Sequence, residues 1–171
     1  MPNRMDTFVS KTKGAVKSVK ARMDGLHGVF ATLAKQHAEA ASLLDAVIAS
    51  PEKREDLWPK IRTALLAHER AEVQEVYPVL RGLPETHALA DRHDIEANAM
   101  EAMIDRLDAM DLRSDAWGAL FEQLADTVKH HAVVEEEEQI FPVAEKALGE
   151  TRAKELDAKF LATHAKLAKP A

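Results

Sequence analysis

The sequence contains no cysteine, and glycine, proline and aromatic residues are scarce. There are 6 glycines and 7 prolines in 171 residues, and aromatic side chains make up 5% of the chain. Without cysteine the chain has no disulfide, no thiolate metal site, no iron–sulfur cluster and no cysteine nucleophile. The rarity of helix-breaking residues, together with the absence of alternating valine and isoleucine runs, predicts an all-α protein.

Long apolar runs are missing too, because no stretch approaches the roughly 18 residues that a membrane span requires. We therefore expect no transmembrane helix. The N-terminus carries charges where a secretion signal would have its apolar core, which favours a cytoplasmic location. The net charge of −6 argues against nucleic acid as the main partner.

Helical periodicity divides most of the chain into long segments separated by short turns. Pro51 suits the first turn of a helix and Gly149 a helix end. The predicted helices cover residues 23–49, about 51–77 or slightly beyond, 84–110, 115–148 and 151–167. We expect an antiparallel up-down-up-down four-helix bundle at 23–149, with extra helical segments at both ends. Residues 150–171 form the C-terminal helix in this interpretation.

Residues 1–22 form a basic arm or helix, with six lysines and arginines against a single acid, Asp6. Two interpretations remain open for this arm. It is either a solvated segment packed on the bundle, or a contact for an acidic partner or a membrane surface.

Each of the four long predicted helices carries one histidine on its apolar face. The second and fourth helices also carry an acid about one turn further along. A buried ionised carboxylate is costly unless it is paired or bound to a metal, and these faces contain no lysine or arginine. The pattern therefore predicts a metal site inside the bundle. The candidate ligands are His37, His68, Glu72, His93, His131, Glu135 and Glu136.

The donor types narrow the choice of metal. Imidazole and carboxylate without thiolate suit iron, manganese or zinc, but tetrahedral zinc would use fewer ligands than are present. Two bridging carboxylates with terminal histidines suit a pair of iron ions. The fourth-helix acid stays ambiguous: spacing from His131 favours Glu135, whereas Glu136 precedes Pro142 by the same six residues that separate Glu72 from Pro78.

Taken together, these motifs resemble the hemerythrin-like, or HHE cation-binding, domains. The resemblance spans about residues 26–148 and rests on "KQHAEAASLLDAV", "AHERAEVQEVYPVL", "RHDIEANAMEAMIDRL" and "HHAVVEEEEQIFP". It implies a four-helix bundle that holds a non-heme iron pair, which an oxo or hydroxo group can bridge. Such centres bind or sense dioxygen, nitric oxide or peroxide, or store and deliver iron.

The resemblance assigns His37, His68, His93 and His131 as ligands and Glu72 as a bridging carboxylate. Oxygen-carrying members have a second histidine on the third helix, four residues after the first, where this chain has Ala97. That departure weakens the oxygen-carrier interpretation, and Glu96, His130 or water could fill the gap. Two alternatives stay open, an iron-dependent peroxidase or oxidase and a metal-free helical interaction module.

The remaining polar residues near these motifs are predicted to lie in water or behind the ligands. This prediction covers Glu69, Glu137 and Glu138 and the histidines at positions 27, 87, 130 and 164. Imidazole ligands need acceptors for their outer N–H groups, and the only tyrosine, Tyr77, is a candidate.

Overall fold

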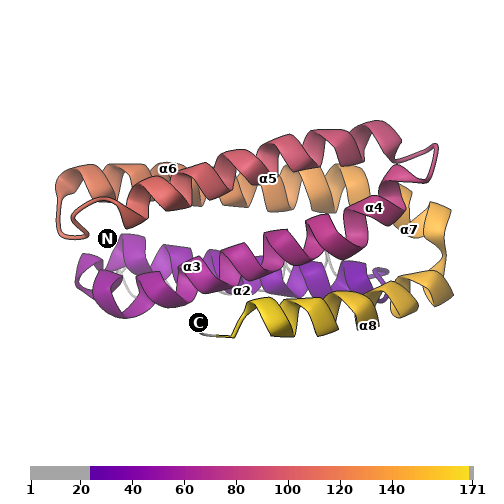
Figure 1. Cartoon of the computed structure of the whole chain (residues 1–171), viewed down its shortest axis with the longest axis horizontal. Coiled ribbons are helices and arrows are strands. Elements are labelled where there is room, and N and C mark those ends of the chain that lie inside the picture. The colour runs from indigo at the N-terminus through magenta and orange to yellow at the C-terminus, as the bar shows by residue number, and fades with distance from the viewer. Residues whose placement is uncertain (1–23, 170–171) are drawn as a thin grey trace, which may run out of the picture.

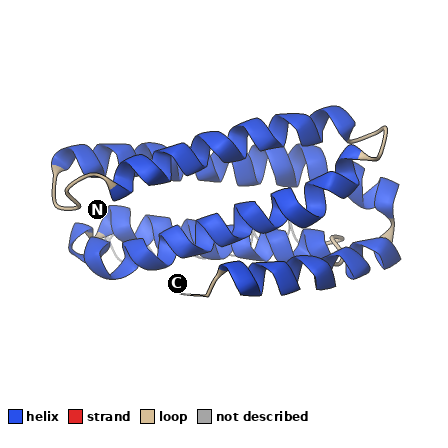
Figure 2. Cartoon of the chain, viewed as in Figure 1, coloured by secondary structure: helices blue, strands red, loops and turns tan. Residues whose placement is uncertain are grey.

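The computed structural model describes residues 24–169, which form helices joined by turns, with no strand among them (Figure 2). The predicted all-α class is confirmed. The predicted basic arm, residues 1–22, lies outside the described residues. Within the described part, no helix is both long and apolar enough to cross a membrane.

The described residues form four long helical rods and one further helix. Two of the rods change from α- to π-helical geometry midway and then return to α. The bounds are α2 Val29–Ala49; a short 3-10 turn, η1, Pro51–Lys53; α3 Arg54–Ala71, η2 Glu72–Val76 and α4 Tyr77–Arg81; α5 His87–Asp108; α6 Asp115–His130, η3 His131–Ile140 and α7 Phe141–Leu148; and α8 Glu150–Leu167, where η2 and η3 are the π-helical segments.

The rods lie side by side along the length of the molecule (Figure 1). α2 contacts both α3 and α6, and α5 contacts α6. α8 runs along the outer side of α2 and α3, and contacts both. The start of α8 approaches α2 so closely that a Cβ at Gly28, which has a φ of 54°, would overlap the backbone of Ala153.

The apolar core is divided into two clusters along the bundle. One surrounds Phe30, Tyr77 and Phe141, and the other surrounds Trp58, Trp117 and Phe121. On every rod the predicted histidine falls between the residues of the first cluster and those of the second. The sequence thus leaves a polar layer between two apolar cores, and this layer contains the candidate site.

Each π-helical segment ends at an aromatic-proline step. Proline has no N–H for the helical ladder, and its ring clashes with the carbonyl of the preceding turn. A wider π turn before Pro78 and before Pro142 accommodates this, so the rods continue as α4 and α7. The second rod therefore continues past Pro78 to Arg81, which agrees with the expected end at residue 77 or slightly beyond.

Candidate metal centre

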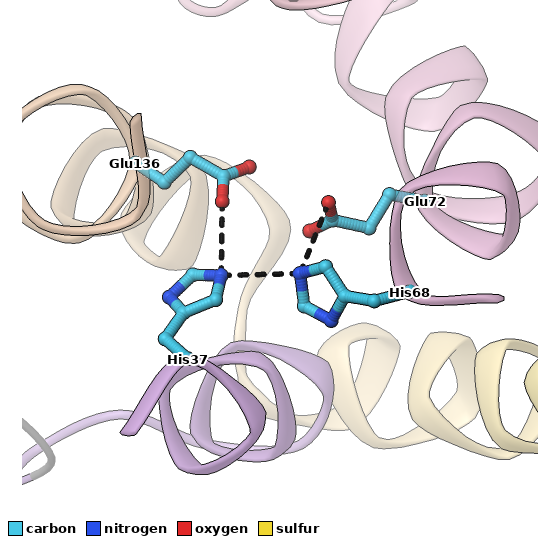
Figure 3. Close-up of side chains that lie close together, drawn as sticks. All are labelled: His37, His68, Glu72 and Glu136. Carbon is cyan, nitrogen blue, oxygen red and sulfur yellow. Dashed lines mark hydrogen bonds and ion pairs between the residues drawn. The ribbon is translucent and has the colours of Figure 1, made fainter. Parts of the chain in front are cut away.

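Four buried side chains from three rods converge in the polar layer (Figure 3). His37 comes from α2, His68 from α3, Glu72 from η2 and Glu136 from η3. The His37 Nε2 atom lies 3.2 Å from His68 Nε2 and 3.0 Å from Glu136 Oε2. His68 Nε2 lies 3.4 Å from Glu72 Oε2. These donor atoms are close enough together to surround one cation.

A second group lies against the first. Glu69 Oε2 is 3.8 Å from the Nε2 atoms of both His93 and His131. His93 Nε2 is also 3.5 Å from Glu72 Oε2 and 3.3 Å from Glu136 Oε1. The Glu72 and Glu136 carboxylates therefore contact histidines of both groups and lie between them.

The π-helical geometry of η3 determines which fourth-rod acid enters the cluster. In an α-helix the residue four positions on stacks above the first, whereas π-helical bonds join residues five apart. Glu136, five residues after His131, is fully buried in the cluster. Glu135 instead faces the outer nitrogen of His131, with its Oε2 3.2 Å from Nδ1.

Glu69 is the cluster residue that the sequence interpretation missed. It is buried, with 9% of its surface exposed, although it was expected in water or behind the ligands. Its spacing of three from Glu72 was a usable signal, because residues three apart share one helix face. Glu69 lies beside His93 and His131, the group in which the resemblance leaves one ligand unaccounted for.

Three of the four histidines hold an acceptor at the outer ring nitrogen. The Nδ1 atoms of His37, His68 and His131 lie 2.9 Å from Glu137, 2.7 Å from Gln36 and 3.0 Å from Glu96. An Nδ1–H that donates outward leaves the Nε2 lone pair facing inward, and this is the tautomer that a metal ligand needs. None of these pairings was predicted.

Tyr77 has a different role from the one predicted. Its hydroxyl donates a hydrogen bond to the Glu136 carboxylate, and its ring stacks on His93 with centroids 3.4 Å apart and planes 12° apart. It therefore orients one shared carboxylate and one imidazole together. The other histidines lie outside the cluster: His27 contacts Glu145, and the imidazole of His130 is mostly exposed.

The cluster contains buried polar atoms that no hydrogen bond satisfies. Buried donors and acceptors are almost always paired in folded proteins, so this concentration requires a partner. Within the described part of the chain, the unsatisfied buried side-chain atoms include Glu69 Oε2, both Glu72 oxygens, both His93 ring nitrogens, His131 Nε2 and Glu136 Oε2. A cation bound among them would satisfy most of these atoms, and imidazole with carboxylate fits iron, manganese or zinc.

Without a cation, protons balance the charge of the cluster. Burial raises the pKa of Glu72 to about 8, and the Glu136 charge adds to this. Burial opposes ionisation of Glu136 too, but the His131 charge and the close contacts with the His37 and His93 imidazoles hold its pKa well below the usual value. Burial lowers the pKa of His37, yet its contacts with Glu136 and Glu137 raise it to about 10. A metal ion would have to displace these protons.

A cavity of about 440 Å³ reaches the cluster from outside. His37, His68, Glu69 and His131 form part of its wall, so atoms of both groups line it. The centre is thus buried without being closed, and a molecule in the cavity would meet the imidazole and carboxylate side chains directly.

Comparison with known proteins agrees with this geometry. The model of the hemerythrin HHE cation-binding domain matches residues 19–144. No curated protein and no solved structure gives a significant match. The match covers most of the chain, including all of the residues that converge in the polar layer. The chain therefore belongs to the hemerythrin HHE cation-binding domain family.

Proposed function

We propose that this chain binds two iron ions in the polar layer and exposes them to a small ligand such as dioxygen, nitric oxide or peroxide. The observation that carries the proposal is the convergence of two donor groups on a shared pair of buried carboxylates. Family membership supports cation binding in general. The identification of two iron ions and of a small ligand goes beyond family membership and is our proposal.

In this proposal His37 and His68 would hold one ion, and His93, His131 and Glu69 would hold the other. Glu72 and Glu136, which contact both groups, would be available to either ion, and the three carboxylates would offset much of the metal charge. Bound iron would supply a redox-active Lewis acid. Glu137, Gln36 and Glu96 orient three of the imidazoles through Nδ1, and Tyr77 orients Glu136.

The donor set favours two ions over one. A single tetrahedral zinc ion takes four ligands, whereas seven side chains converge in the two groups with their shared acids. The cavity favours exchange with an exogenous ligand over a fully closed structural site.

We also infer that the rods follow the antiparallel up-down-up-down order of a four-helix bundle, with α8 added outside it. A cytoplasmic location stays a prediction of the sequence.

Metal content of His68→Ala, with His130→Ala as its matched control, tests this proposal. His68 lies in the cluster, whereas the imidazole of His130 is mostly exposed. Elemental analysis of protein purified from cells should find close to two irons per chain in the parent and in His130→Ala, and a large loss in His68→Ala. A parent protein with no metal, or with a single zinc ion, would refute the iron pair.

Binding and catalysis use the same ligands, so an iron-dependent peroxidase or oxidase is the second candidate. The accessible cavity favours it, because a closed centre could not turn over a substrate. Consumption of hydrogen peroxide by the iron-loaded chain, compared with His68→Ala, separates the two. Turnover lost with His68 supports an enzyme, and equal slow consumption by both proteins supports a binding protein.

A further inference from the structure

The geometry of the cavity points to a larger ligand than a diatomic gas or hydrogen peroxide. We propose that the cavity binds an aliphatic carboxylate, whose head group reaches the metal centre. The head-group half of this inference rests on the proposed function, because it requires bound metal. The aliphatic half rests on the cavity alone.

The volume of the cavity indicates the size of its ligand. One water molecule takes about 30 Å³ in the liquid, and pockets for organic ligands span about 300–1,000 Å³. The cavity holds about 440 Å³, so a dioxygen or peroxide molecule would leave most of it unfilled. Its size is that of a site for an organic molecule.

The residues that line the cavity indicate the polarity of its ligand. At the cluster end, His131 Nε2 and Glu69 Oε2 are buried, lack hydrogen-bond partners and belong to residues that line the cavity. The rest of the wall is largely aliphatic, with side chains of Ala40, Leu43, Ala64, Leu65, Val128 and Ala132, and it also includes the polar residues Glu39, Lys60 and Thr63. An apolar tail would bury its surface against this wall. An oxygen head would face the metals, since hard oxygen donors suit iron ligated by imidazole and carboxylate.

One side of the cavity is formed by α8, which lies beyond the matched family domain. His164 of α8 and Ala168, which directly follows α8, line the cavity, whereas the family match stops at residue 144. Phe160 of α8 packs edge-on against the His68 ring, with centroids 6.1 Å apart. The size of the cavity therefore depends both on the matched domain and on α8.

Calorimetric titration with straight-chain ligands of increasing length tests both halves. Acetate, butanoate, hexanoate and octanoate are titrated into the iron-loaded full chain, and the matching 1-alkanols into the metal-free chain. Burial of each methylene should strengthen binding about threefold to fourfold in both series. The carboxylates should bind the iron-loaded chain at least about tenfold more tightly than the metal-free chain, which offers the head group no metal ion.

Two variants test whether the aliphatic ligand binds in this cavity. Ala64→Phe and Ala40→Leu fill it from different helices and should remove the dependence on chain length while leaving acetate binding intact. Ala102→Phe, at an exposed position on α5, is the control and should keep the dependence. Using two cavity variants guards against one that misfolds, and circular dichroism checks each fold.

The outcomes separate this inference from the proposed function. Affinities that do not change with chain length, in a parent that retains two irons, overturn the aliphatic ligand and leave the metal centre standing. If affinity still depends on ligand chain length in both cavity variants, the ligand does not bind in this cavity. Failure to bind iron overturns the metal centre and the head-group half, and the alkanol series on metal-free protein still decides the aliphatic half.

Discussion

Substitution of Glu136 by glutamine, compared with the same change at Glu135, tests whether η3 selects the carboxylate that the metals share. The two residues are neighbours in sequence but differ in environment. Glu136 is fully buried against His37 and His93, whereas Glu135 is partly exposed and contacts only the outer nitrogen of His131 within the cluster. Glutamine preserves size and removes the negative charge.

The magnitudes follow from these contacts. In the metal-free protein, loss of one partner of a buried ion pair costs about 3–5 kcal/mol of unfolding free energy, so Glu136→Gln should approach this range. Glu135→Gln removes the charge of one of two acceptors at His131 Nδ1, since Glu96 remains 3.0 Å away, and should cost at most about 1 kcal/mol. Iron content should fall well below two per chain in Glu136→Gln and stay near two in Glu135→Gln.

Urea unfolding of the metal-free proteins and elemental analysis of the purified ones provide both readouts. Circular dichroism confirms that each variant remains helical. Equal losses of iron in the two variants, or two irons retained by Glu136→Gln, would refute the reasoning that the π turn directs Glu136 inward. A larger loss of stability in Glu135→Gln would also refute it.

Three further predictions concern the cluster histidines, the acceptor at His68 and the contact between Gly28 and α8. First, stability of the metal-free protein should fall as pH rises from about 6.5 toward 10, because the folded chain keeps protons on His37 and His93, whose pKa values are about 10 and 11, that the unfolded chain releases. Thermal unfolding across this range should show the decline, and iron loading should flatten it. Second, Gln36→Leu removes the acceptor at His68 Nδ1 and should weaken iron binding by about 10- to 100-fold in a chelator competition, with unchanged affinity as the contrary result. Third, Gly28→Ala should lower the melting temperature by several degrees, because its Cβ meets the α8 backbone and φ is positive; an unchanged melting temperature would show that α8 can shift.

Much of the fold was predictable because helical periodicity and turn residues are local signals. The four histidines fall at matching places on their rods, so their common layer could be inferred from residue spacing alone. Glu72 followed from its spacing of four from His68 on one helix face. The start of α2 at Val29, instead of residue 23, was not predictable in the same way, because the approach of α8 to Gly28 is a contact between distant segments.

The details of the site depended on features that periodicity does not capture. α-Helical spacing favoured Glu135 as strongly as the proline spacing favoured Glu136, and only the π turn distinguishes them. The two aromatic-proline steps were the available signal for that turn. Two outer acceptors, Glu137 for His37 and Glu96 for His131, come from other rods, so no local pattern in the sequence identifies them.

Mössbauer spectroscopy of the anaerobically purified full chain, before and after exposure to air, tests the central claim most directly when combined with metal content. Two irons joined by the Glu72 and Glu136 carboxylates should appear at close to two per chain, and after oxidation the pair should be magnetically coupled. Uncoupled iron at one per chain, or a chain that carries zinc or no metal at all, would contradict a shared two-ion centre between the two apolar cores.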